Sequence, residues 1–328
     1  MTTFKEIRGT TIEVVSSDPS NPDQGQIWYN SSSGTLKGSQ YSSAWSAGGN
    51  LNFTVRGSGG AGTQTAGLSF GGFSGPSVTN RTESYNGTSW TNLPATLNTS
   101  RSIMGTAGTQ TAALGIGGYK DTFPVANSTV ANVESYNGTS WTSITGLGTA
   151  RYYGAGAGTQ TAALLFGGAN GSPLSNVESW NGSSWTAVSS LNTSRSALAG
   201  AGTQTAALGF GGQTPTVSAA TESWNGSAWT SVNSINTARK TLAGCGTQTS
   251  ALAFGGFISS PTGSSATELW NGTSWTSNPT GLGTARYTLG GVGTQTTALA
   301  FGGINPGGNL TATEEWSQGF ATKTITVS

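Results

Sequence analysis

Residues 195–230 read RSALAGAGTQTAALGFGGQTPTVSAATESWNGSAWT, and variants of this stretch recur along most of the chain. A pair of glycines follows each Gly-Thr-Gln-Thr tetrapeptide, and a variable stretch then leads to Glu-x-aromatic. The tetrapeptide recurs in steps of 46, 50, 44, 44 and 47 residues, starting at Gly62, Gly108, Gly158, Gly202, Gly246 and Gly293. A period of about 20–50 residues is the signature of a repeat architecture, in which each repeat is one supersecondary unit.

One period predicts four short strands. The first follows the arginine, over Arg195–Gly200, and the second is Thr205–Phe210, which is apolar on both faces as a strand between two layers must be. The third carries Glu222 and Trp224 two residues apart, hence on one face of the strand. The fourth contains Trp229.

The connection between the last two strands is Asn225-Gly226, which suits a two-residue type I′ turn because both central positions need a positive φ. A four-stranded antiparallel sheet cannot bury both of its faces alone, so neighbouring sheets must stack and the array must close. We therefore expect an all-β fold, a six-bladed β-propeller of four-stranded antiparallel blades.

The repeat resembles the kelch repeat. The shared features are apolar residues before Gly-Gly, an aromatic residue, a tryptophan five positions later and a downstream arginine, as in Trp224, Trp229 and Arg239. The resemblance covers about residues 41–317, and it implies a propeller.

The two ends of the chain complete the array. Residues 41–45, Tyr-Ser-Ser-Ala-Trp, look like the end of a repeat that lacks its beginning, so Trp45 is expected in the same blade as Trp316. The alternating stretches 10–15 and 321–327 are expected to pair as one further ladder. The predicted organisation is an N-terminal strand or hairpin segment for attachment or closure at 1–40, the propeller at 41–317 and a C-terminal strand at 318–328.

Two charged residues recur once per repeat. The glutamates are Glu83, Glu134, Glu178, Glu222, Glu268 and Glu314, and the arginines are Arg56, Arg101, Arg151, Arg195, Arg239 and Arg286. A binding site rarely needs identical residues in every repeat, so we interpret them as structural residues, buried and hydrogen-bonded inside the propeller. The alternative is a ring of arginines that binds a ligand.

Composition argues against several classes of protein. Net charge is +1 with charged residues at 8%, so the clustered Lys and Arg of a nucleic-acid site are missing. No apolar run is long enough to span a membrane and no signal peptide is evident. The chain has no histidine, and Cys245 is its only cysteine. We therefore predict no catalytic residue, no metal and no cofactor.

The stretches between the second and third strands differ in length and chemistry, whereas the other turns barely change. Binding residues concentrate on variable loops held by a rigid scaffold. The longest stretch, 119–133, combines aromatic residues with charges found outside the repeat pattern. The predicted ligand-binding residues are Tyr119, Lys120, Asp121 and Phe123.

The N-terminal stretch GQIWYNSSSGTLK, residues 25–37, reads as a hairpin and resembles a short module at the start of tail-fibre-like virion proteins of marine bacteriophages. The resemblance implies a non-enzymatic virion surface or tail-associated protein, made in the host cytoplasm. Its partners would be other virion proteins or a host-surface receptor, glycan or protein. Two alternatives remain open: a cellular kelch-type interaction scaffold and a glycan-cleaving propeller enzyme.

Overall fold

The computed structural model describes residues 12–20, 26–121, 128–259 and 263–325. Within these ranges every regular element is a β-strand. The described residues contain no helix long and apolar enough to cross a membrane. The chain divides into two compact units: a smaller one of Met1–Ala44 with Gln318–Ser328, and a larger one of Trp45–Ser317.

The larger unit repeats one antiparallel sheet, which we number I to VI in chain order. The order of strands in each is β4-β5-β8-β9 (I), β10-β11-β12-β13 (II), β14-β15-β16-β17 (III), β18-β19-β22-β23 (IV), β24-β25-β26-β27 (V) and β28-β29-β32-β3 (VI). Sheet VI continues with β2 and β1, which belong to the smaller unit. These repeated sheets confirm the all-β prediction and fit a β-propeller.

The strands that hold the same place in each sheet have similar sequences and bounds. The first strands are β4 (Gly59–Gly62), β10 (Gly105–Gly108), β14 (Ala155–Gly158), β18 (Ala199–Gly202), β24 (Ala243–Gly246) and β28 (Gly290–Gly293). The second strands are β5 (Gly67–Phe70), β11 (Ala113–Ile116), β15 (Ala163–Phe166), β19 (Ala207–Phe210), β25 (Ala251–Phe254) and β29 (Thr297–Phe301). The third strands are β8 (Thr82–Tyr85), β12 (Val133–Tyr136), β16 (Val177–Trp180), β22 (Thr221–Trp224), β26 (Thr267–Trp270) and β32 (Thr313–Thr324). The outer strands are β9 (Trp90–Leu93), β13 (Trp141–Ile144), β17 (Trp185–Val188), β23 (Trp229–Val232), β27 (Trp275–Asn278) and β3 (Thr35–Ala47).

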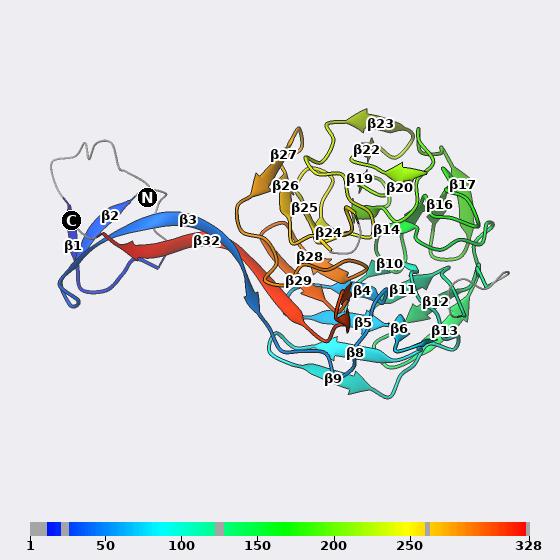
Figure 1. Ribbon diagram of the computed structural model, residues 1–328, viewed down its shortest axis with the longest axis horizontal. Coiled ribbons are helices and arrows are strands. Elements are labelled where there is room, and N and C mark those ends of the chain that lie inside the picture. Colours follow the sequence, from blue (N-terminus) through cyan, green and yellow to red (C-terminus); the bar gives the residue numbers. More distant parts are fainter. Residues whose placement is uncertain (1–11, 21–25, 122–127, 260–262, 326–328) are drawn as a thin grey trace. The chain divides into compact units, whose positions relative to one another are not determined.

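The first strands lie innermost, and outer strands such as β23 and β27 lie at the periphery (Figure 1). Each first strand contacts the first strand of the next sheet, and β28 of sheet VI contacts β4 of sheet I. Glycine and alanine dominate these strands, which lets the six of them approach one another. Five of the second strands are buried along their whole length and β29 is buried after its first residue, Thr297, as their apolar sequences predict.

A cycle of backbone hydrogen bonds connects the loops that enter the first strands. In each loop one residue adopts a positive φ, and its N–H donates to the carbonyl of the corresponding residue in the preceding sheet; Ile103 donates to Gly57 over 2.7 Å and Gly57 to Thr288 over 2.8 Å. The six residues are Gly57, Ile103, Tyr153, Ala197, Thr241 and Thr288. Positive φ is strained for a β-branched residue, and such strain persists only where the surroundings enforce it.

The glutamine of each Gly-Thr-Gln-Thr turn also links neighbouring sheets. Its side-chain amide donates to the backbone oxygen of the aromatic residue in the third strand of the preceding sheet, as Gln110 does to Tyr85 over 2.6 Å. Gln64 of sheet I donates in the same way to Trp316 of sheet VI over 2.6 Å. This role explains why the turn barely changes between repeats.

Trp45 lies where the sequence predicts, because β3 pairs with β32 and serves as the outer strand of sheet VI. Its ring lies 5.5 Å from that of Trp316, centroid to centroid, and its Nε1 donates to Thr267 of sheet V over 2.9 Å. An N-terminal strand therefore completes the C-terminal sheet.

Two local predictions are wrong. The Asn-Gly connection is a four-residue loop: Trp224 pairs with Trp229, the Asn225 side chain accepts the N–H of Ser227 and of Ala228, and only Gly226 has a positive φ. The two hydrogen bonds to the Asn225 side chain stabilise this longer loop, which needs a positive φ only at Gly226. The first strand of this repeat also begins later than predicted, at Ala199, because the positive φ of Ala197 interrupts the extended backbone after Arg195.

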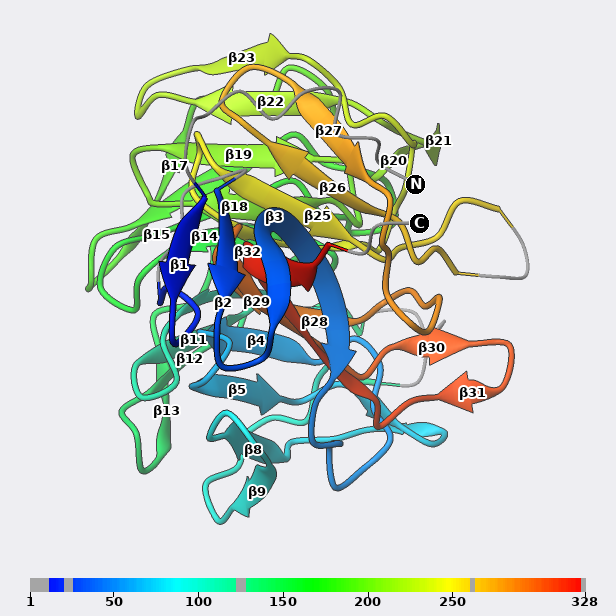
Figure 2. The ribbon, with the colours of Figure 1, turned by 90° about the vertical axis from the view of Figure 1, so that its left-hand side faces the viewer.

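The smaller unit contains β1 (Glu13–Val15), β2 (Ile27–Asn30) and parts of β3 and β32. The predicted hairpin is confirmed, since β2 pairs antiparallel with β3. The predicted terminal ladder is wrong in its described part: β1 pairs in parallel with β2, and β32 pairs with β3 (Figure 2). Asp18 connects β2 and β3 by accepting hydrogen bonds from the side chains of Lys37, Asn30 and Trp28. These bonds, that from Lys37 most strongly, lower the pKa of Asp18 to about 2.

Candidate ligand-binding site

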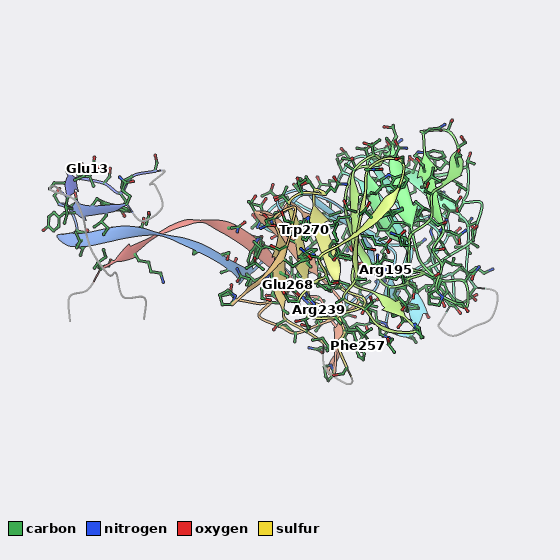
Figure 3. All side chains as sticks on the ribbon, turned by 90° about the horizontal axis from the view of Figure 1, so that it is seen from above. Glu13, Arg195, Arg239, Phe257, Glu268 and Trp270 are labelled. Atoms are coloured by element: carbon green, nitrogen blue, oxygen red, sulfur yellow. The ribbon has the colours of Figure 1, made fainter. Side chains whose placement is uncertain are left out.

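The variable segments between second and third strands are 73–81, 119–132, 169–176, 213–220, 257–266 and 304–312, and their described parts lie on one face of the larger unit, which we call the variable face. Antiparallel strands alternate in direction, so these segments all leave the same ends of the sheets. Arg239 lies between Trp270 and Phe257 along sheet V (Figure 3), and Phe257 is at the variable face.

Each variable segment begins close to the loop that enters the first strand of its own sheet. In sheets II to VI its first residue pairs with the residue after the repeat arginine, as Gln213 pairs with Ser196 and Phe257 with Lys240. Short hairpins extend three of the described segments: β6 (Phe73–Ser74) with β7 (Ser77–Val78), β20 (Gln213–Thr214) with β21 (Thr216–Val217), and β30 (Ile304–Asn305) with β31 (Gly308–Asn309). Side chains from two parts of each repeat therefore converge on this face.

A pocket of about 230 Å³ lies where sheets III to VI meet at the variable face. Three aromatic side chains, Tyr153, Phe257 and Tyr287, line it together with Gln213 and Lys240. Phe257 and Tyr287 pack edge to face, with centroids 5.2 Å apart at 71°. This geometry holds two rings at a fixed angle beside polar groups.

Among the described residues that line this pocket, Lys240 is the one with a charged side chain. Its Nζ donates to Oε1 of Gln213 over 2.7 Å and lies 5.2 Å from the centroid of Phe257. Two of its three N–H donors thus remain for a ligand. Burial raises the pKa of Tyr153 to about 12, so its hydroxyl is a neutral hydrogen-bonding group at ordinary pH.

Of the residues predicted to bind ligand, the structure describes Tyr119, Lys120 and Asp121, and these three differ in exposure. Tyr119 is 4% exposed and packs with Phe73 and Ile103, because it pairs with Ser102 at the base of its segment. Lys120 is exposed, and Asp121 accepts a hydrogen bond from Ser128 over 2.5 Å. Phe123 lies outside the described residues. Tyr119 therefore offers little surface to a ligand, and ligand binding by these four residues stays a prediction.

The repeat arginines and glutamates are buried as predicted, with one exception. Among the described residues, buried ion pairs join Arg101 to Glu134, Arg151 to Glu178, Arg195 to Glu222, Arg239 to Glu268 and Arg286 to Glu314. Arg195 also donates to the carbonyls of Gly211 and Ala220, over 3.1 and 2.6 Å. Burial lowers the pKa of Arg195 and Glu222 opposes that shift. These contacts lie inside each sheet, beneath the variable face.

Arg56 is the exception. It is only partly buried, donates to Asn309 over 3.1 Å and lies 5.0 Å from the centroid of Phe73. Its backbone pairs with Phe73, the first residue of the variable segment of sheet I. In every other sheet the corresponding pairing is made by the residue after the arginine. Arg56 therefore does not belong with the structural arginines. Val55, one residue earlier, occupies the arginine position of sheet I.

Sequence reasoning did not identify Lys240, Tyr153 or Tyr287 as candidate site residues. A signal was present, because the two residues after the repeat arginine vary between repeats: Tyr152-Tyr153, Lys240-Thr241 and Tyr287-Thr288 occupy the same place. The chain matches no protein-family model, and a search of curated proteins finds no match to it.

Proposed function

We propose that the chain is a binding protein built on a closed, six-bladed, kelch-like propeller in which sheets I to VI are the blades. Three cyclic features support this architecture: the contacts between first strands, the backbone hydrogen bonds at positive φ, and the glutamine links from each sheet to the one before. In each of these features, sheet I is connected to sheet VI in the same way as sheet II is connected to sheet I. A closed ring leaves no exposed sheet edge at its centre.

The ligand we propose is a saccharide that carries an acidic group. The observation behind this assignment is the pocket of Phe257, Tyr287 and Lys240 on the variable face. Aromatic faces pack against the C–H groups of sugars, and the amide of Gln213 offers hydrogen bonds to hydroxyls. Lys240 supplies a positive charge, and no aspartate or glutamate lines the described part of the pocket. A carboxylate or sulfate on the sugar would be attracted by it.

Binding is proposed in preference to catalysis. Glycoside hydrolysis uses a pair of carboxyl groups about 5–10 Å apart on either side of the bond that breaks. The groups that line this pocket are rings, hydroxyls, an amide and an ammonium, all of which hold a ligand without cleaving it. The biological setting we propose is a bacteriophage virion, in which the chain recognises a host-surface glycan. This setting is supported by the resemblance of residues 25–37.

The binding proposal is tested on a glycan array that carries neutral, carboxylated and sulfated oligosaccharides. We expect selective retention on acidic glycans, falling at least tenfold in Lys240→Gln, which keeps hydrogen-bonding capacity and removes the charge. Lys323→Gln is the matched control, because Lys323 is an exposed lysine of β32 and does not line the pocket.

Phe257→Ala tests the aromatic contribution separately. We expect it to weaken binding to acidic glycans and to lower the weaker binding to neutral glycans by a similar factor, whereas Lys240→Gln affects the acidic ones alone. Equal loss in Lys240→Gln and Lys323→Gln, or no retention of the parent protein on any glycan, would contradict the proposal. The virion setting has its own test, which is labelling of purified phage particles with an antibody against the propeller and imaging by electron microscopy.

A further inference from the structure

Sheet I has the position for a buried arginine but carries Val55 there. The carbonyl of Val55 accepts a hydrogen bond from Gly303 over 2.8 Å, as the carbonyl of Arg239 does from Gly212 over 2.8 Å. The sequence agrees with this register: Arg56 precedes its Gly-Thr-Gln-Thr turn by six residues, whereas the other repeat arginines precede theirs by seven. The guanidinium present in the five other sheets is therefore missing from this one.

The arginine position is surrounded by a defined set of acceptors. In sheet II, Arg101 donates to the carbonyls of Gly115, Gly117 and Asn132 and to the Glu134 carboxylate, over distances from 2.5 to 3.1 Å. A planar guanidinium with its fork of donors fits such a set. The three carbonyls belong to the second strand, the glycine pair and the residue before the third strand, so every sheet supplies them from its backbone register, and the carboxylate comes from the repeat glutamate of the third strand.

The corresponding residues of sheet I are Ser69, Gly71, Arg81 and Glu83. Ser69 pairs with Glu83 as Gly115 pairs with Glu134, and Gly71 donates to the carbonyl of Arg81 as Gly117 does to that of Asn132. All four line a single cavity, which Val55 and Phe53 border as well. The acceptors that hold a guanidinium elsewhere thus surround a space here, which we call the sheet I slot.

Glu83 faces this slot without a cation. Its side chain is buried, with the residue 5% exposed, and Oε2 accepts the backbone and side-chain N–H groups of Asn52 over 3.0 and 2.8 Å. Among the described residues no lysine or arginine forms an ion pair with it. A buried carboxylate without a positive partner is unfavourable, and a cation that reaches it gains attraction at low dielectric.

Phe53 and Arg81 close the slot. Phe53 stands two residues before Val55, where the other repeats have threonine, and the guanidinium carbon of Arg81 lies 3.7 Å from its ring centroid. The remaining space holds about one water molecule. Arg81 is exposed, so its side chain can swing away and admit a larger group.

We propose that the sheet I slot binds a guanidinium group supplied from outside the chain, which takes the place of the missing arginine beside Glu83. The slot lies beneath the variable face but is separate from the saccharide pocket, since the two share no lining residue. It therefore adds a second ligand, of opposite charge, to the one proposed above.

The test compares the parent protein with Phe53→Thr/Val55→Arg, which restores the two residues found at these positions in the other repeats. Methylguanidinium and an uncharged-flank peptide, acetyl-Gly-Arg-Gly-amide, are titrated by calorimetry at constant ionic strength, with methylammonium as the control cation. We expect saturable binding to the parent, at least tenfold weaker binding to the double variant, and tighter binding to Arg81→Ala, which removes the side chain over the slot.

The two probes distinguish the source of the guanidinium. Binding of both points to a small molecule, and binding of the peptide alone points to an arginine from a protein partner; either result supports the slot. An equal response of parent and double variant, or equal binding of methylguanidinium and methylammonium, overturns the proposal. The double variant also has a readout without ligand: its thermal midpoint should exceed that of the parent, which shows that it folds and fills the slot.

Discussion

Sheets I and III have the same arrangement of four strands, but each lacks a different side-chain interaction. Sheet III has the buried ion pair Arg151–Glu178. Its Val177 packs against Trp229 of sheet IV, and the Trp229 Nε1 has no hydrogen-bond partner among the described residues. Sheet I keeps the corresponding bond, from Trp141 to Thr82 over 3.0 Å, and lacks the arginine.

The comparison separates two functions of the repeat. The arginine and glutamate join strands and loops within one sheet, whereas the tryptophan and threonine join one sheet to the next. Sheets I, IV, V and VI carry threonine at the start of the third strand, and each threonine accepts a bond from the tryptophan of the following sheet. Sheets II and III carry valine, which leaves Trp185 and Trp229 without a partner in the described part of the chain. Because the two losses occur in different sheets, each interaction can be removed or restored alone.

Removing the arginine from sheet III should have the largest effect. Arg151→Ala leaves Glu178 buried without a cation, and breaking such a pair costs about 3–5 kcal/mol. Urea unfolding should show the free energy of unfolding reduced by this amount, and Arg195→Ala should behave similarly. A loss below about 1 kcal/mol, typical of exposed ion pairs, would contradict the structural role of the arginine.

Breaking the bond between sheets I and II should cost less. Thr82→Val keeps the shape of the side chain and leaves the buried Nε1 of Trp141 without an acceptor, which costs about 1–3 kcal/mol. The measurement is again urea unfolding. Thr91→Val is a suitable control, because Thr91 is an exposed residue of β9 in the same sheet. Equal effects of the two substitutions would remove the hydrogen bond as the explanation.

Restoring the missing bond of sheet III should stabilise the protein. Val177→Thr places a hydroxyl opposite Trp229 Nε1, as Thr221 lies opposite Trp275, and a net gain of about 1 kcal/mol is expected for one hydrogen bond. The thermal midpoint should rise accordingly. A lower midpoint would show that burying the hydroxyl outweighs the new bond at this site.

The smallest effect is expected at Arg56. Arg56→Ala removes one hydrogen bond and a contact with Phe73 at a partly exposed site, so the expected loss is about 1 kcal/mol or less. A loss as large as that of Arg151→Ala would show that Arg56 does fill the structural position in solution.

The repeat pattern was enough to predict the four strands per period, the placement of Trp45 beside Trp316, and the burial of Arg195 and Glu178. These features depend on periodicity and on the high cost of leaving either sheet faces or charges unsatisfied, and both are visible in residue types. The same pattern misplaced Arg56, although its spacing of six residues rather than seven already marked the difference. Arg56 was grouped with the other repeat arginines by residue type, although Val55 holds their position in the register of sheet I.

Other features were decided by the tertiary structure alone. Tyr119 and Tyr287 are both aromatic residues of variable positions, yet Tyr119 packs inward with Ile103 while Tyr287 lines a pocket with Phe257 and Lys240. Which rings meet depends on how neighbouring repeats, about 45 residues apart in sequence, are placed around the centre. The strained backbone of residues such as Thr241 has the same origin, because a cycle of hydrogen bonds between sheets imposes it. Residue types determined what each repeat must satisfy within itself, and the packing of repeats against one another determined what remained available to a ligand.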